Sequence, residues 1–215
     1  MSEIIEAVKR GDLEAVRDLL EAQPELLHAS ENNISAILMA LYHGKTEVVP
    51  LFLERGRELT FHEACAMGDG ARVKQLLEAD PSLLNSRSPD GFPAVGLPIF
   101  FRQPEVARYL IEKGADVAAP SDNPMRVAPV HAAAAACDRE TLRMLLERGA
   151  DANAKQQSDY TPMHTAASRG DIETAQLLLS FGADPRAIGS DGQSPMDVAA
   201  SHDQPAFAEW IQTVT

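Results

Sequence analysis

The sequence predicts an all-α solenoid of about seven stacked helix-turn-helix repeats, and two observations lead to this fold class. The first is a period: residues 128–151 (APVHAAAAACDRETLRMLLERGAD) and 161–184 (TPMHTAASRGDIETAQLLLSFGAD) agree at a shift of 33. A repeat of this length is typical of helix pairs that bury their apolar faces only against neighbouring pairs. The second is composition: 45% of the residues are hydrophobic but only 5% are aromatic, so small side chains that allow close helix stacking dominate.

The repeat divides the chain into one domain of about seven units. The period is clearest from residue 123 to residue 205 and weakens before residue 90. The expected units are 2–30, 31–58, 59–87, 88–118, 119–156, 157–188 and 189–215.

Each unit begins and ends its helices with residues suited to those positions. In the sixth unit, Thr161 is placed to cap the first helix and Pro162 lies in its first turn, where no N–H donor is needed. Gly170 ends this helix with a residue that tolerates positive φ. Asp171 is placed to cap the second helix, and Gly182 ends it. The pattern therefore predicts two short antiparallel helices for each unit.

The residue pattern of the repeat resembles that of the ankyrin family. The family pattern is an Asp-Gly turn, Thr-Pro-Leu-His, Ala-Ala, Gly, a Leu-Leu pair and Gly-Ala-Asp. The segments that carry the resemblance are Thr161-Pro162-Met163-His164, Leu178-Leu179 and Gly182-Ala183-Asp184, and much of the pattern recurs one period earlier. The resemblance implies a non-enzymatic module that binds a protein partner on its concave face. The inter-repeat turns and the two positions before each helix-ending Gly form that face in the family.

Three histidines, His62, His131 and His164, occupy the same register of the repeat. We expect each to hydrogen-bond local backbone or the adjacent repeat, as the family resemblance implies. A shared metal is the rival interpretation, but ligands of one zinc ion lie within about 4 Å of each other, whereas helix layers are about 8–10 Å apart. The Ser, Thr and Asp residues near His164 are explained by capping. We therefore predict no catalytic residue, no metal and no cofactor.

Charge and hydropathy limit the partners. The net charge of −13 disfavours binding to nucleic acid or to an anionic membrane surface. The sequence has no apolar run near the roughly 18 residues that cross a membrane, and its first residues do not resemble a signal peptide. Cys65 and Cys137 lie two repeats apart, about 20 Å, beyond disulfide reach. We expect a cytoplasmic monomer whose partner is a protein.

The 33-residue period is interrupted at two places, and the first lies between the second and third units. Leu38 and His62 occupy equivalent positions but are 24 residues apart instead of 33. The projecting turn that normally links two repeats is therefore expected to be missing, which predicts a notch or tilt in the stack. This change is either a tolerated loop deletion or a place where a partner or a second copy docks.

The second break is the fourth unit. Pro93-Ala94-Val95-Gly96 replaces Thr-Pro-Leu-His, and Pro98 falls at the first Ala position, where it is expected to shorten the helix. The region from 89 to 129 holds seven of the chain's 14 prolines. We expect it to be the least regular part of the stack.

The candidate partner site follows from these departures. Phe, Tyr and Met gather at concave positions of the third to sixth units, and exposed aromatic anchors commonly dominate binding energy. The predicted site residues are Met67, Phe92, Phe100, Phe101, Arg102, Met125, Tyr160 and Arg169, with the two arginines at the rim. The alternative is that the distortion at Pro98 turns Phe100 and Phe101 into the core. A different function, a regulatory or inhibitory subunit that occludes a partner enzyme's active site with the fourth unit, also fits the sequence.

Overall fold

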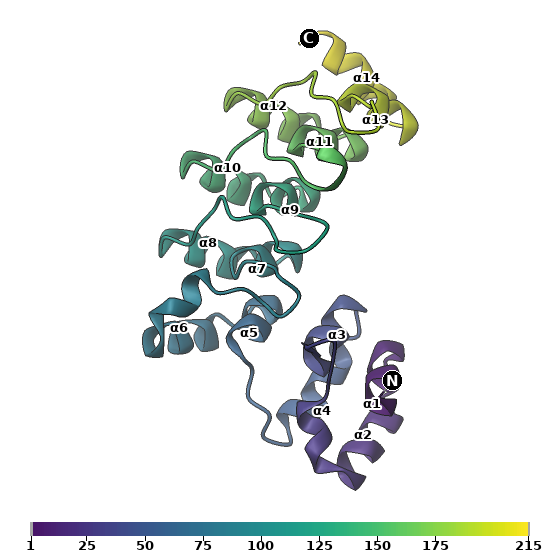
Figure 1. Ribbon diagram of the computed structural model, residues 1–215, viewed down its shortest axis with the longest axis vertical. Helices are drawn as coiled ribbons and strands as arrows, with labels where there is room; N and C mark the ends of the chain where they lie inside the picture. The colour runs from purple at the N-terminus through teal and green to yellow at the C-terminus, as the bar shows by residue number, and fades with distance from the viewer. Residues whose placement is uncertain (1, 215) are drawn as a thin grey trace.

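The computed structural model describes residues 2–214, which form a stack of paired α-helices (Figure 1). The fourteen α-helices within this range are α1 (Glu3–Arg10), α2 (Leu13–Ala22), α3 (Ala36–Tyr42), α4 (Val49–Leu53), α5 (Phe61–Met67), α6 (Gly70–Ala79), α7 (Gly96–Phe100), α8 (Pro104–Glu112), α9 (Pro129–Ala136), α10 (Arg139–Glu147), α11 (Pro162–Arg169), α12 (Ile172–Ser180), α13 (Pro195–Ser201) and α14 (Pro205–Gln212). Shorter elements are the 3-10 helices η1 (Pro24–His28), η2 (Thr46–Val48), η3 (Pro81–Asn85) and η4 (Gln157–Asp159), and the two-stranded antiparallel hairpin of β1 (Ser30–Glu31) and β2 (Ile34–Ser35).

The helices form two layers. From α5 onward, the first helix of each pair packs on the first helix of the next pair, and the second helices α6, α8, α10 and α12 form the other layer. One continuous apolar core runs through the stack from Ile4 to Ile211. No pair has a core of its own, so the predicted all-α repeat fold is confirmed.

Most capping expectations are met. The carboxylate of Asp171 accepts a hydrogen bond of 3.0 Å from the backbone N–H of Thr174, and Asp138 does the same for Thr141 at 3.1 Å. Thr161 differs from expectation, since its side chain makes no capping bond to the helix backbone. Its hydroxyl instead lies 3.0 Å from Nδ1 of His164. Both the backbone N–H and the hydroxyl of Thr161 therefore interact with the histidine ring.

His131 and His164 join adjacent units, as expected, whereas Nε2 of His62 lies 3.0 Å from the hydroxyl oxygen of Ser86 within its own unit. Nδ1 of His164 accepts a hydrogen bond of 3.1 Å from the backbone N–H of Thr161, and its Nε2 lies 3.2 Å from the carbonyl oxygen of Gln193 in the next unit. His131 makes the equivalent contacts, with Nε2 lying 3.3 Å from the carbonyl oxygen of Tyr160. Burial lowers the pKa of His131 to about 4, and it also lowers the pKa of His164. Both rings are neutral structural elements at pH 7.

The stack is interrupted between α4 and α5. Helices α1–α4 form a separate bundle, set at an angle to the stack of α5–α14, and α4 and α6 lie apart (Figure 1). Residues 54–60 lead from α4 into α5 with no intervening hairpin, whereas β1 and β2 form one between the first and second helix pairs. The tilt expected from the short spacing is therefore present, and α3 keeps its packing against α5.

Unit four is shortened as predicted. Its first helix, α7, has five residues, whereas α9 and α11 each have eight. Pro98 is the third residue of α7, where the backbone N–H would have no partner within the helix, so the proline ring is tolerated there. This short helix ends early and presents Phe100 and Phe101 at its end.

Candidate protein-binding surface

Four aromatic side chains gather at the end of α7, and we call them the aromatic cluster: Tyr42, Phe92, Phe100 and Phe101. The ring of Phe100 lies with its centroid 5.1 Å from Phe101, 5.9 Å from Tyr42 and 6.0 Å from Phe92. Phe100 is 47% exposed although three aromatic rings surround it. Phe100 is therefore an exposed apolar side chain whose ring is held in place by its aromatic neighbours.

The break in the stack brings Tyr42 to this cluster. Tyr42 ends α3, before the break, yet its ring lies 5.1 Å from that of Phe101, and its hydroxyl donates a hydrogen bond to Asp90. Burial, together with the bond to Asp90, raises the pKa of the Tyr42 phenol. The side chain of Asn123 donates to the carbonyl oxygen of Asp90 at 2.9 Å, which fixes the loop that carries Asp90. The two parts of the stack thus meet at the aromatic cluster.

The predicted site residues fall into three environments. Phe92 is 8% exposed and lies in the core beneath Phe100, so it supports the surface rather than forming it. Met67 and Phe101 are half-buried and pack against the core. Met125 is 49% exposed in the turn before α9, and Arg102 and Arg169 are exposed at the ends of α7 and α11. The structure brings the phenylalanines together at one place, with Arg102 directly after them in the chain.

Tyr160 has a structural environment of its own. Its ring stacks on that of His164 with centroids 4.6 Å apart, and its hydroxyl donates a hydrogen bond of 2.8 Å to the carboxylate of Asp191. With Met125 and Val127, Tyr160 also lines a shallow cavity of about 240 Å³ between successive turns. This cavity is separate from the aromatic cluster.

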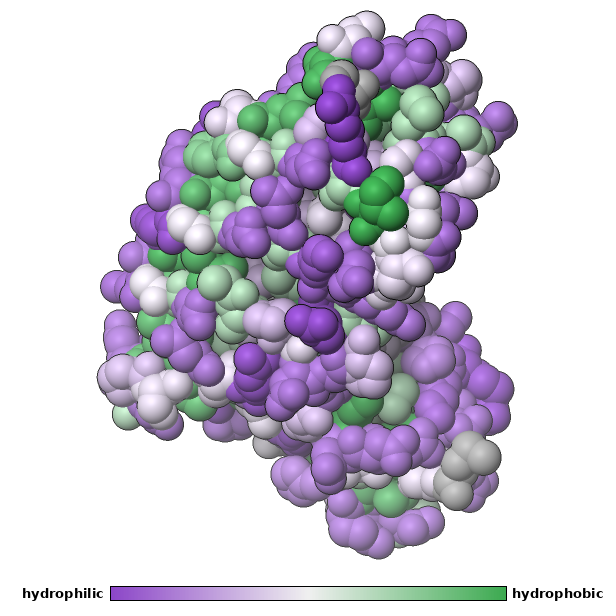
Figure 2. All heavy atoms as spheres, turned by 45° about the horizontal axis from the view of Figure 1, so that its top comes forward, coloured by the Kyte–Doolittle hydropathy of each residue, from purple (hydrophilic) through white to green (hydrophobic). Residues whose placement is uncertain are grey.

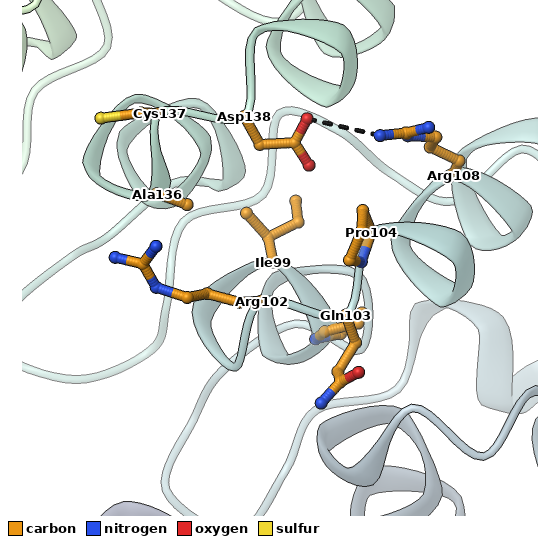
Figure 3. A pocket seen from close by; sticks show the side chains of 9 residues that line it. Ile99, Arg102, Gln103, Pro104, Arg108, Ala136, Cys137 and Asp138 are labelled. Atoms are coloured by element: carbon orange, nitrogen blue, oxygen red, sulfur yellow. Dashed lines mark ion pairs between the residues drawn. The ribbon is translucent and has the colours of Figure 1, made fainter.

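A second cavity, of about 280 Å³, lies beside the end of α7 (Figure 3). Its lining includes Ile99, Arg102, Arg108, Cys137 and Asp138. Arg102 and Arg108 lie on opposite sides of Ile99, and the Arg102 guanidinium extends beside Ala136 (Figure 3). The repeat pattern does not reveal this pocket, although the alignment of Cys137 with the helix-ending Gly170 marks position 137 as unusual.

Metal-binding groups and membrane-spanning helices are both absent among the described residues. Within residues 2–214, no group of three or more His, Cys, Asp or Glu side chains is arranged to hold a metal ion. In the same range, no helix combines the length and apolar character needed to cross a membrane. Hydrophilic side chains cover most of the face shown in Figure 2, with apolar atoms scattered between them.

Comparison with known proteins identifies the family. The chain is 24% identical over 204 residues to the Danio rerio protein named "Putative palmitoyltransferase ZDHHC13", and the match covers 74% of this chain. The chain spans only 31% of the length of that protein. The family description "Ankyrin repeats (3 copies)" matches residues 61–156 and 130–213, which together make up more than half of the sequence. The chain belongs to the ankyrin-repeat family, whose repeats generally serve as modules for protein–protein interaction.

Proposed function

We propose that this chain binds a protein partner through its concave surface and catalyses no reaction of its own. The observation that carries the proposal is the exposure of Phe100: a ring 47% open to solvent, supported by three other aromatic rings. Exposed aromatic side chains on a firm base are typical energetic centres of protein interfaces. Phe100 differs from other exposed apolar side chains, such as Ile188 and Phe181, because aromatic rings support it on three sides.

Each predicted residue has a part in this proposal. Phe100 and Met125 supply exposed apolar contacts, and Met67, Phe101 and Tyr160 supply half-buried ones. Phe92 holds Phe100 in place from below. Arg102 and Arg169 form the polar rim, where charged side chains steer association and fix orientation. Tyr42, which was not in the predicted set, joins it through its contacts with Phe100 and Phe101.

The non-enzymatic part of the proposal rests on the family, and the environment of Cys65 agrees with it. The name of the Danio rerio relative refers to a palmitoyltransferase, but only 31% of that protein is matched. Cys65 is buried, and burial raises the pKa of its thiol to about 12, which opposes formation of a nucleophilic thiolate. We therefore assign the shared segment a binding role.

Further parts of the proposal concern the molecule as a whole. We take the seven helix pairs as seven ankyrin units, of which the first two are the most divergent in sequence. Both cysteines are free, which suits a reducing compartment such as the cytoplasm. The net charge of −13 argues against nucleic acid as a partner, and we propose that the chain acts as a monomer.

Affinity purification of the full chain with quantitative mass spectrometry tests the proposal. We expect Phe100→Ala to lower recovery of the specific partner by about tenfold or more, the effect of removing an interface anchor. Phe181→Ala is the matched control, because Phe181 is also an exposed phenylalanine, 37% accessible, but follows the outer helix α12. Equal loss of the partner with both variants, or with neither, contradicts the assignment. A fall in the partner's own enzymatic activity on binding would identify the chain as an inhibitory subunit.

A further inference from the structure

The first helix of each pair is followed by one residue in the left-handed backbone conformation. Glycine occupies this position in four pairs, as Gly11, Gly44, Gly68 and Gly170, with φ between 66° and 78°. In the fourth and fifth pairs the residues are Arg102 (φ 58°) and Cys137 (φ 57°). Side chains with a Cβ atom adopt this conformation less readily than glycine. Asp203 (φ 59°) takes this position in the seventh pair. Three of the seven pairs therefore have a side chain where glycine adopts the backbone conformation more readily, and two of these pairs are adjacent.

Arg102 and Cys137 both line the 280 Å³ pocket, and the thiol of Cys137 points away from Ile99 (Figure 3). Replacing either by glycine would remove part of the pocket wall. Pockets that hold whole small molecules are usually about 300–1,000 Å³. This pocket is at the lower limit of that range and suits a single side chain of a protein partner.

The charges in the pocket favour an acidic side chain. Its lining holds two arginines and one aspartate, a local charge of +1 on a chain whose net charge is −13. Arg108 is already neutralised, because it pairs with Glu140 at 2.7 Å and with Asp138 at 3.6 Å. Asp138 is engaged as the cap of α10, where it accepts hydrogen bonds from the backbone N–H and the hydroxyl of Thr141.

Arg102 is the pocket cation that remains available. Among residues 2–214, no carboxylate oxygen lies within 4.0 Å of its guanidinium. A guanidinium binds a carboxylate with two parallel hydrogen bonds, which gives both strength and a defined orientation. The pocket thus offers a free carboxylate receptor with an apolar floor formed by Ile99 and Pro98.

We propose that this pocket receives an aspartate or glutamate of the partner, bound by Arg102, while an apolar side chain close to it in the same segment packs on Phe100. The two sites are adjacent, because Phe100 and Arg102 are separated by one residue at the end of α7. The proposal rests on the proposed function and gives the partner a chemistry: an extended segment with an acidic residue near an aromatic or large aliphatic one. Recognition of the partner then accounts for the side chain of Arg102 at its left-handed position, since strained residues gather at functional sites.

A phage-displayed library of random linear peptides, selected on the full chain, tests the proposal. We expect the wild-type protein to enrich peptides that place Asp or Glu near a large apolar residue. Peptides selected on Arg102→Gly should lose the enrichment in acidic residues and keep the enrichment in apolar ones. Peptides selected on Phe100→Ala should keep the acidic enrichment and lose the apolar one. Asp203→Gly is the matched control, because Asp203 takes the same left-handed position after α13 with φ 59°. It should select the same peptides as wild type.

The strongest selected peptide then allows a quantitative measurement. We expect Arg102→Gly to weaken binding of this peptide about tenfold or more. Replacing the acidic residue of the peptide by the matching amide should then not weaken binding to the Arg102→Gly protein any further. Thermal unfolding should show no loss of stability in Arg102→Gly, so weaker binding cannot be attributed to unfolding. Peptides without acidic enrichment, or an acidic preference that survives in Arg102→Gly, would overturn the assignment of the pocket. If the library yields no binder above a blank surface, this inference fails, whereas the proposed function fails only if affinity purification recovers no specific partner.

Discussion

The hydroxyl of Ser35 donates a hydrogen bond of 2.6 Å to the carboxylate of Glu63, and this contact joins the two parts of the interrupted stack. Ser35 caps α3, before the break, whereas Glu63 lies in the first turn of α5, after it. Glu63 is only 1% exposed and also accepts hydrogen bonds from the backbone N–H of Thr60 at 2.7 Å and from Arg57 at 3.1 Å. A buried, fully bonded carboxylate therefore replaces the missing hairpin as the link across the break.

The first prediction concerns this link. Arg57→Ala should lower the free energy of unfolding by about 3 kcal/mol, because it leaves the Glu63 carboxylate buried without its cation. Denaturant unfolding measures the loss, and small-angle X-ray scattering should show a changed angle between α1–α4 and the rest of the stack. Glu58→Ala is the control: the Glu58 side chain is 78% exposed, so its ion pair with Arg72 should contribute about 1 kcal/mol or less. Equal losses in the two variants would argue against a special role of Glu63.

The second prediction separates the surface of α7 from its core. Phe100→Ala should cost about 1 kcal/mol or less, since the ring is 47% exposed. Leu97→Ala, in the same short helix but fully buried, should cost about 3 kcal/mol through loss of apolar burial and the cavity left behind. Denaturant unfolding of both variants compares them directly. A cost of about 3 kcal/mol for Phe100→Ala would mean that this ring belongs to the core.

The third prediction follows from the left-handed positions. Arg102→Gly and Cys137→Gly should each leave the fold as stable as wild type or more stable, by up to about 1 kcal/mol, because glycine adopts positive φ without the Cβ penalty. The gain is limited because glycine also increases the freedom of the unfolded chain. Differential scanning calorimetry provides the measurement. A lowered melting temperature in both variants would show that these side chains stabilise the native state.

The fourth prediction concerns pH. Burial lowers the pKa of His131 to about 4, below its ordinary value of about 6.5, so the unfolded chain binds its proton at higher pH than the folded chain does. Stability is therefore fully present above about pH 6.5 and falls as the pH is lowered toward 4, by at most about 1.4 kcal/mol per pH unit for this group.

The variant His131→Asn should be less stable at pH 7 and should lose less stability between pH 6.5 and 4.5. Urea unfolding at several pH values checks both effects, with the exposed His28→Asn as the control. An unchanged pH slope in His131→Asn would mean that other groups cause the acid sensitivity.

Much of the fold could be predicted because the sequence repeats. The positions of His131 and His164 recur with the period and serve the same bonds, and so do the capping positions of Asp138 and Asp171. In α5, Glu63 makes the bond to the cap N–H that these histidines make elsewhere, so the position of His62 serves a different bond. The short interval before His62 was also sufficient to predict the tilt, since a missing hairpin removes the spacer between two layers. Contacts across the tilt could not be predicted, because they depend on the angle that the two parts adopt. Tyr42 is the clearest case: it meets Phe101 from a helix two units earlier.

The candidate site could be predicted only in part for a related reason. Concave positions follow from the repeat, so Phe100, Phe101 and Arg102 could be selected by register. Register does not specify which of the predicted side chains are exposed: Phe92 lies in the core, whereas Phe100 is open to solvent. The pocket beside Arg102 needs backbone angles at two successive helix ends, and only the structure provides them.

Hydrogen–deuterium exchange of the full chain, with and without the protein partner recovered by affinity purification, tests the central claim most directly. If the concave surface around the end of α7 is the binding site, new protection should appear in residues 96–103 and in the turn around Met125, while the outer helices α10 and α12 keep their exchange rates. Protection confined to those outer helices, with none at α7, would contradict the account.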